Sequence, residues 1–308
     1  MLMIFIHTSA YFLKWPLVIF LWNYAHFAVP IFIFCSAYLS FKTKKGTMSI
    51  IQILKRLQRL LIPYYLFLAS WFSYIAITKK GAITLKGVLD KVFFLNAKSA
   101  DLEWLVVLFI YFIFLFPFIY YLSKKPIVFW IYTIFALLSS VLLLFIHTSV
   151  PYRFLMWLPW SLLLSAILLV VKYEKNRLCI PVVIGISLVL FFLSRSIIVA
   201  QNHSLTLTHN KYPPNLYYLS YGMFWTFLIY MIYNKIRFPN LIDRFFFFYS
   251  AHSYSIFFIH FLIIFIFLDF FPFRILQWWG FFLIVLVLAP LVQLVLNKTM
   301  KCVIASRH

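Results

Sequence analysis

Apolar runs as long as a membrane-spanning helix follow one another along almost the whole chain. A helix needs about 20 apolar residues to cross the hydrocarbon core of a bilayer. The runs that approach or exceed this length comprise residues 17–41, 60–77, 104–122, 127–146, 154–171, 180–200, 216–233, 245–268 and 275–296, and a shorter run covers residues 1–13. Since 65% of the 308 residues are hydrophobic and only 11% are charged, water-soluble protein classes are excluded. The sequence therefore predicts one all-α domain over residues 1–308, a polytopic bundle of about ten transmembrane helices.

The Lys and Arg residues are unevenly distributed among the loops between these runs. They gather in the short loops that follow alternate runs, whereas the short loops on the opposite side hold few of them. Cytoplasmic loops of membrane proteins are enriched in Lys and Arg, so we expect both termini to be cytoplasmic. The protein is then a multi-pass protein of the cytoplasmic membrane. Its formal net charge of +21 indicates contact with anionic lipid and not with nucleic acid.

A basic stretch immediately precedes the run 60–77. Lys55, Arg56 and Arg59 lie within about one turn of each other on a helix, so they form a basic ridge at the cytoplasmic membrane surface. These cations can anchor the span in its orientation. They can equally make charge-assisted hydrogen bonds to the phosphates of a polyanion that arrives from the cytosol. The stretch alone leaves both interpretations open.

Four histidines, His7, His26, His252 and His260, lie inside the predicted spans, where ionisable side chains are costly and often functional, and two of them are candidates for the chemistry. A neutral imidazole can take a proton from a sugar hydroxyl that attacks a thioester carbonyl, which makes His7 a candidate general base. His260 is a candidate for orienting a substrate. The alternative for both residues is an interhelical hydrogen bond that plays no part in catalysis.

Few acidic residues are available for catalysis. Asp101 and Glu103 lie at the outer end of the run 104–122, where they can fix the tautomer of a catalytic imidazole, bind sugar hydroxyls or remain solvated. Arg153, beside another outer turn, can bind a phosphate or extend to the lipid headgroups. Because the chain holds only 6 Asp and Glu residues, we expect no metal site.

Six segments, in chain order, resemble the motifs of the integral membrane acyltransferase family 3, the bacterial O-acyltransferases of surface glycans. The segments are IFIHTSAYF at residues 4–12, VPIFIFCSAYLSF at 29–41, KRLQRLLIPYY at 55–65, EWLVVLFIYFIFLFP at 103–117, KYPPNLYYLSYG at 211–222 and SYSIFFIHFLII at 253–264. Ala37 stands where the family usually has a glycine. An arginine that the family usually carries about eleven residues before its histidine would precede Met1, so we expect either that the first helix is partial or that the true start lies upstream.

The resemblance implies ten core helices, an acyl-CoA donor on the cytosolic side and an acceptor that is reached from outside. It implies that His7 is the catalytic histidine and that Arg56 and Arg59 are part of the donor entrance, where we expect Lys55 to bind the donor as well. The developing oxyanion needs a hydrogen-bond donor. The expected substrate-binding residues, some of which can supply that donor, are Ser36, Tyr38, Trp104, Arg153 and His260, and Glu103 is the expected catalytic partner of the histidine.

The sequence therefore predicts a membrane O-acyltransferase that moves an acyl group, expected to be acetyl, from acyl-CoA to a hydroxyl of a cell-surface or lipid-linked saccharide. A transporter of a glycan or lipid-linked sugar is the alternative, because aromatic residues, 22% of the chain, also stack on sugars. A glycosyltransferase that uses a polyprenyl-phosphate sugar fits less well. Such enzymes usually use an acidic base in an early outer loop, and no acidic residue occurs before Asp90.

Overall fold

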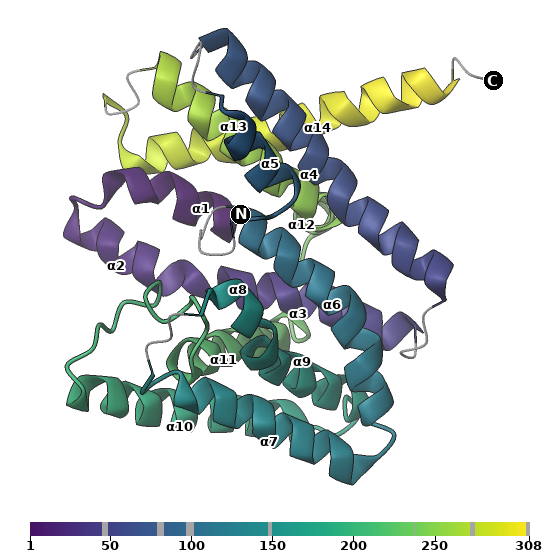
Figure 1. The fold of residues 1–308 in the computed structure, drawn as a ribbon, viewed down its shortest axis with the longest axis vertical. Coiled ribbons are helices and arrows are strands. Elements are labelled where there is room, and N and C mark those ends of the chain that lie inside the picture. Colours follow the sequence, from purple (N-terminus) through teal and green to yellow (C-terminus); the bar gives the residue numbers. More distant parts are fainter. Residues whose placement is uncertain are drawn as a thin grey trace. The chain divides into compact units, whose positions relative to one another are not determined.

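The fold is built from helices, as the apolar runs predict. The computed structural model of the protein describes residues 1–44, 49–78, 83–96, 102–146, 150–236, 238–271 and 275–305, and these ranges contain no strand (Figure 1). The helices are α1 (Leu2–Ser9), α2 (Pro16–Tyr24), α3 (Ala28–Lys44), α4 (Ile50–Thr78), α5 (Leu85–Val92), α6 (Glu103–Leu122), α7 (Pro126–Leu142), α8 (Tyr152–Leu155), α9 (Trp157–Lys172), α10 (Cys179–Ala200), α11 (Leu216–Tyr233), α12 (Asn240–Ala251), α13 (Ser253–Phe270) and α14 (Trp278–Ala305). Short 3₁₀ turns, η1 (Ala10–Phe12) and η2 (Ala25–Phe27), follow α1 and α2. The all-α prediction is therefore confirmed.

Every predicted apolar run coincides with helix, but three of the runs are interrupted. The run 17–41 is divided by η2, the run 154–171 is divided at Met156 between α8 and α9, and the run 245–268 is divided at His252, where α12 ends and α13 begins. Within the described ranges, seven helices are long and apolar enough to cross a membrane, and two shorter apolar helices cover Leu2–Phe12 and Pro126–Leu142. The count of ten spans and the cytoplasmic position of both termini stay predictions.

The chain divides into two compact units. Unit 1 comprises Met1–Ala25, Leu61–Leu85 and Arg237–His308, and unit 2 comprises His26–Leu60 and Lys86–Ile236. In unit 1, α1 packs on α13 and α14, and α13 packs along α14. Buried aliphatic and aromatic side chains from these helices form the core of unit 1, including Ile4, Ile264 and Phe281.

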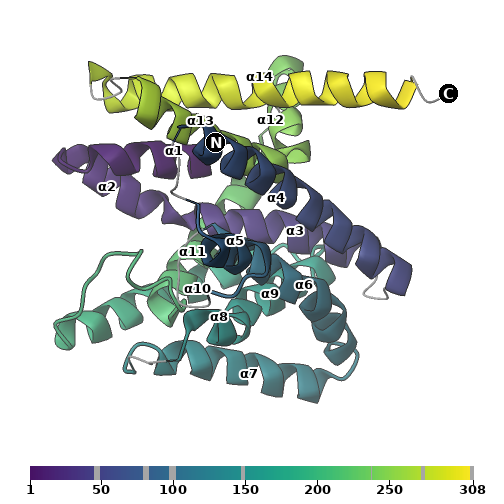
Figure 2. The same cartoon turned by 45° about the horizontal axis from the view of Figure 1, so that its top comes forward.

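Helix α9 is the centre of unit 2. It contacts α3, α6, α7 and α11, and α10 packs side by side with α11 (Figure 2). The segment from Trp160 to Val170 is apolar on every face, with Ser161 and Ser165 as its polar residues, and it is buried almost throughout. A helix that is apolar all round is stable only where other helices or lipid surround it, which explains why α9 takes the central position.

One close approach in unit 2 depends on a glycine. Gly222 of α11 faces Pro30 of α3, and a Cβ atom at residue 222 would lie 2.4 Å from Pro30 Cγ and 2.9 Å from Pro30 Cβ. The ring of Pro30 is part of a rigid helix and cannot rotate away. The backbones of α3 and α11 can therefore approach this closely only because residue 222 has no side chain.

We predict that Gly222→Ala destabilises the protein, whereas Gly185→Ala in α10 does not. Overpacking at residue 222 costs about 1–3 kcal/mol, while an alanine at residue 185 meets no atom within 4 Å. Alanine also relieves the entropic cost of about 0.5–1 kcal/mol that glycine imposes in a helix. Unfolding in detergent measures both variants. Equal unfolding midpoints for the two variants would show that the α3–α11 contact is not tight.

Candidate functional site

The structure brings together the two histidines that the sequence singles out, His7 and His260, in unit 1. Their ring centroids lie 5.3 Å apart, with His7 on α1 and His260 on α13. The ring centroid of Phe261 lies 4.3 Å from that of His7, with an angle of 84° between the ring planes. For Phe257 and His7 the centroid distance is 6.2 Å and the angle is 89°. Phe257 and Phe261 also contact the ring of His260, so the two imidazoles share these aromatic neighbours.

The hydrogen bonding of His260 defines its tautomer. Its Nδ1 lies 3.1 Å from the carbonyl oxygen of Ile256, one turn earlier in α13. Because a carbonyl only accepts hydrogen bonds, Nδ1 carries the proton and Nε2 presents a lone pair. His260 is fully buried, and its Nε2 has no hydrogen-bond partner within the described residues. An acceptor atom in this position is suited to receive a hydrogen bond from a ligand hydroxyl.

A buried ion pair lies at one end of unit 2, where α5, α6 and α8 meet. The carboxylate of Glu103 has Lys91 Nζ 2.8 Å from Oε1 and Arg153 Nη2 3.4 Å from Oε2. The side chains of Glu103 and Arg153 are only 6% and 3% exposed. Both carboxylate oxygens of Glu103 thus contact cations. Neither of these two contacts is an imidazole, so the predicted catalytic role of Glu103 stays a prediction.

Trp104, the next residue of α6, lies in an aromatic cluster with a buried lysine. The Nζ atom of Lys211 is 4.7 Å from the ring centroid of Trp104 and 5.0 Å from that of Tyr212. Tyr212 also meets Trp104 and Tyr152 edge to face, at 5.1 and 5.3 Å. Burial lowers the pKa of Lys211 to about 7. Lys211 lies in the segment KYPPNLYYLSYG, but the sequence did not indicate that its ammonium group stacks on Trp104.

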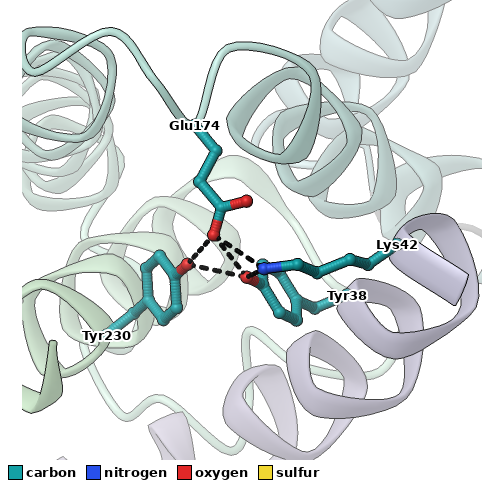
Figure 3. Close-up of polar contacts among 4 residues, drawn as sticks. All are labelled: Tyr38, Lys42, Glu174 and Tyr230. Atoms are coloured by element: carbon teal, nitrogen blue, oxygen red, sulfur yellow. Dashed lines mark hydrogen bonds and ion pairs between the residues drawn. The ribbon is translucent and has the colours of Figure 1, made fainter.

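The opposite end of unit 2 holds a polar cluster around Tyr38. Figure 3 shows the side chains of Tyr38, Lys42, Glu174 and Tyr230 pointing toward one another from α3, the α9–α10 loop and α11. Tyr38 Oη donates to Glu174 Oε1 at 2.6 Å, and Lys42 Nζ donates to Tyr38 Oη at 2.8 Å and to Glu174 Oε1 at 3.0 Å. Tyr230 Oη lies 3.0 Å from Tyr38 Oη and 3.1 Å from the same carboxylate oxygen. The hydrogen bond from Tyr38, with help from Lys42, lowers the pKa of Glu174 below its ordinary value.

The basic ridge is helical, as predicted, and belongs to the first turns of α4. Arg56 is half-buried: its Nη2 donates to Ser40 Oγ of α3 at 3.1 Å, and its guanidinium lies 5.9 Å from the ring centroid of Phe116 in α6. Lys55 and Arg59 are exposed. The ridge therefore has one cation fixed against the bundle and two that remain available to an anion.

The predicted residues fall into three places. His7 and His260 lie together in unit 1, Glu103, Trp104 and Arg153 lie together at one end of unit 2, and Tyr38 and the ridge lie toward the other end of unit 2. Ser36 is half-buried in α3, two residues before Tyr38. Asp101 lies outside the described residues. Within the described part of the chain, no three His, Cys, Asp or Glu side chains gather as metal ligands.

The two ion-paired glutamates should differ sharply in their contribution to stability. Glu103→Gln removes the carboxylate that offsets a buried guanidinium, and breaking such a pair costs about 3–5 kcal/mol. Glu174→Gln is the matched change at an exposed pair, in which the Lys42 and Glu174 side chains are 51% and 36% exposed, and such pairs contribute about 0–1 kcal/mol. Unfolding in detergent at neutral pH compares the variants. A larger loss of stability for Glu174→Gln would contradict this assignment.

Comparison with protein families matches residues 1–297 to the acyltransferase domain family, which confirms the resemblance seen in the motifs. No curated protein and no solved structure matches the chain. The family match covers nearly all of the 308 residues, and the described helices include seven that are long and apolar enough to span a membrane. The protein is therefore a multi-pass membrane protein, and it belongs to acyltransferase family 3, the family of membrane O-acyltransferases.

Proposed function

We propose that the protein transfers an acyl group, expected to be acetyl, from cytosolic acyl-CoA to a hydroxyl of a cell-surface or lipid-linked saccharide at the cytoplasmic membrane. The observation that carries this proposal is the pair of imidazoles, His7 and His260, at a ring separation of 5.3 Å in a chain of an acyltransferase family. Ionisable side chains inside membrane helices are costly and are usually functional.

His7 is the proposed general base. A neutral imidazole accepts the proton of the acceptor hydroxyl as that oxygen attacks the carbonyl carbon of the thioester. The tetrahedral intermediate then collapses, the carbon–sulfur bond breaks, and the imidazolium returns its proton to the leaving sulfur. The products are an acyl ester of the saccharide and the free thiol of CoA. This sequence of steps needs one proton shuttle and no further reactant.

His260 is proposed to bind and orient the acceptor. Its protonated Nδ1 is held by the carbonyl of Ile256, so the ring cannot rotate freely, and its Nε2 can only accept a hydrogen bond. A saccharide hydroxyl is a donor of the required kind. With the reacting hydroxyl aimed at His7, a second hydroxyl of the same sugar can donate to Nε2 of His260, so that one imidazole takes the proton while the other holds the sugar.

The basic ridge of α4 is proposed to bind the donor. The exposed side chains of Lys55 and Arg59 can reach phosphate oxygens, and the contact of Arg56 with Ser40 and Phe116 fixes the direction of one guanidinium. Charge-assisted bonds from arginine to phosphate are short and directional. Two or three such cations match the phosphates of CoA better than those of a single lipid headgroup.

Trp104 and Arg153 are proposed to bind the acceptor at the other end of unit 2. Glu103 then serves as a positioning residue, because it holds the guanidinium of Arg153 through a buried ion pair. The oxyanion of the intermediate needs a hydrogen-bond donor. The candidates for that donor are Ser36, Tyr38 and Trp104. The hydroxyl of Tyr38 already donates to Glu174, so Ser36 and the indole N–H of Trp104 are the better choices.

The test is acyl transfer by the purified, reconstituted protein, with radiolabelled acetyl-CoA and saccharide extracted from the envelope of the host cell. We expect His7→Ala to lower kcat by about 10²–10⁴-fold, the usual contribution of a general base. His252→Ala is the matched control, because His252 lies at the junction of α12 and α13 in the same unit and is bonded to Asn297. This control should keep kcat within a few-fold of the wild type.

Two results would overturn the proposal. Transfer at the wild-type rate by correctly inserted His7→Ala protein would remove the general base from the mechanism. Movement of saccharide across the vesicle membrane, with no acyl transfer by the wild type, would instead establish the transporter alternative.

A further inference from the structure

A cavity of about 550 Å³ lies wholly within unit 2, between the end of α7 and the α10–α11 loop. One wall is apolar and the other polar, and together they are lined by Leu143, Leu144, Ile146, Ile198, Asn202, His203, Ser204, His209, Asn210, Tyr212, Pro213 and Asn215. Small-molecule sites usually measure about 300–1,000 Å³ and combine an apolar lining with a few polar groups. This cavity has the size and the composition of a binding site.

We propose that this cavity binds a neutral saccharide, one or two sugar units of the acceptor glycan. The inference rests on the proposed function for the identity of the glycan, but it assigns a binding site to residues for which the sequence indicated no role. Three properties of the cavity favour this ligand: its charge, its rigidity and its neighbours.

The charge of the lining favours a neutral ligand. Among the described residues that line the cavity there is no Asp, Glu, Lys or Arg, and the polar side chains are amides, imidazoles and the hydroxyls of Ser204 and Tyr212. A phosphate or a sugar acid would need cations for strong binding. Sugar hydroxyls both donate and accept hydrogen bonds, as amides and imidazoles do. The carbon–hydrogen faces of a sugar ring match the wall formed by Leu144, Ile146 and Ile198.

The loop that forms the polar wall is held rigid by its own hydrogen bonds. Asn210 Nδ2 donates to the carbonyls of Ser204 and Thr206, both at 2.9 Å. Asn215 Nδ2 donates to Asn210 Oδ1 at 2.6 Å, and Asn215 Oδ1 accepts from the backbone N–H of Tyr218 at the start of α11. The two amides therefore fix the loop on α11, and a preformed site loses little entropy when it binds.

The side chains of Asn202 and His209 remain for a ligand. Both are exposed, both line the cavity, and neither makes a side-chain hydrogen bond with another described residue. The loop positions the side chains of Asn202 and His209 but makes no hydrogen bond to them. Each can therefore bind a sugar hydroxyl with little reorganisation of the loop.

The cavity adjoins the proposed acceptor residues. Tyr212, which lines it, meets Trp104 edge to face at 5.1 Å and Tyr152 at 5.3 Å. Trp104 follows Glu103, whose carboxylate pairs with Arg153. A glycan seated in the cavity therefore contacts a tyrosine that is one ring away from the residues proposed to present the acceptor.

The experiment measures binding without acyl-CoA, so that it does not depend on catalysis. The probe is the tritium-labelled oligosaccharide mixture released from the envelope of the host cell, separated into neutral and anionic fractions. Wild-type protein in nanodiscs should retain neutral oligosaccharide. Ile146→Trp, which fills the cavity from its apolar wall, should weaken this binding by at least tenfold, and His209→Leu should weaken it as well.

The matched control is Ile134→Trp. Ile134 and Ile146 are 52% and 55% exposed, but only Ile146 lines the cavity, so the control carries the same change on the outside of α7 and should bind like the wild type. Retention of the anionic fraction only, retention of neither fraction, or equal binding by the wild type, Ile146→Trp and His209→Leu would each overturn the proposal. Since His7→Ala should bind the neutral fraction normally, a failure of catalysis is distinguished from a failure of this site.

Discussion

An ionised side chain inside a membrane must be paired with an opposite charge or reach the membrane surface, because lipid solvates charge so poorly. This constraint explains where the few charges of the protein lie. The side chain of Glu103 is only 6% exposed, and each of its carboxylate oxygens contacts a cation. Glu174, in a loop, keeps its carboxylate exposed while it binds Tyr38 and Lys42. These two carboxylate clusters of unit 2 therefore lie at its two ends, and the segment of α9 from Trp160 to Val170 between them holds no charged residue.

The same constraint gives the two imidazoles of unit 1 their significance. A histidine is the one ordinary side chain that can be neutral inside a membrane and still move a proton near neutral pH. His7 and His260 lie on different helices, and packing of α1 against α13 brings their rings to 5.3 Å. The Nδ1 atom of His260 makes a structural hydrogen bond to the carbonyl of Ile256. Its Nε2 atom is buried and has no hydrogen-bond partner among the described residues, so a structural role does not account for it. Binding of a substrate hydroxyl accounts for it.

The sequence was sufficient to predict the helices, because hydrophobicity over about 20 residues is a local property. Local patterns also predicted the helical ridge at Arg56 and Arg59. They placed His7 and His260 inside apolar runs, which made both histidines candidates. The sequence did not predict α5 or the first residues of α12, since helices or helix ends of this length are too short for a hydropathy pattern of that size. Nor did it predict that η2 and His252 would interrupt apolar runs, because a break within an apolar segment depends on tertiary packing.

The partners of the site residues were the least predictable part. The sequence indicated Glu103 and Arg153 as separate candidates. Their ion pair joins residues 50 positions apart, and no local sequence pattern predicts such a contact. The sequence indicated Lys211 only as part of a motif, whereas the fold buries its ammonium group against Trp104. The cavity beside Tyr212 likewise depends on α7 and the α10–α11 loop meeting in space. These features come from packing between distant segments, which the order of residues along the chain does not reveal.

The central claim is that the thioester and the acceptor hydroxyl approach the catalytic histidine from opposite sides of the membrane. Sealed vesicles of known orientation test it most directly, because acetyl-CoA does not cross a bilayer unaided. With radiolabelled acetyl-CoA outside, inside-out vesicles should acylate saccharide in their lumen, and right-side-out vesicles should not. Replacing Arg56 and Arg59 together by alanine should raise the KM for acetyl-CoA in the active vesicles. Equal acylation by vesicles of both orientations would contradict the account.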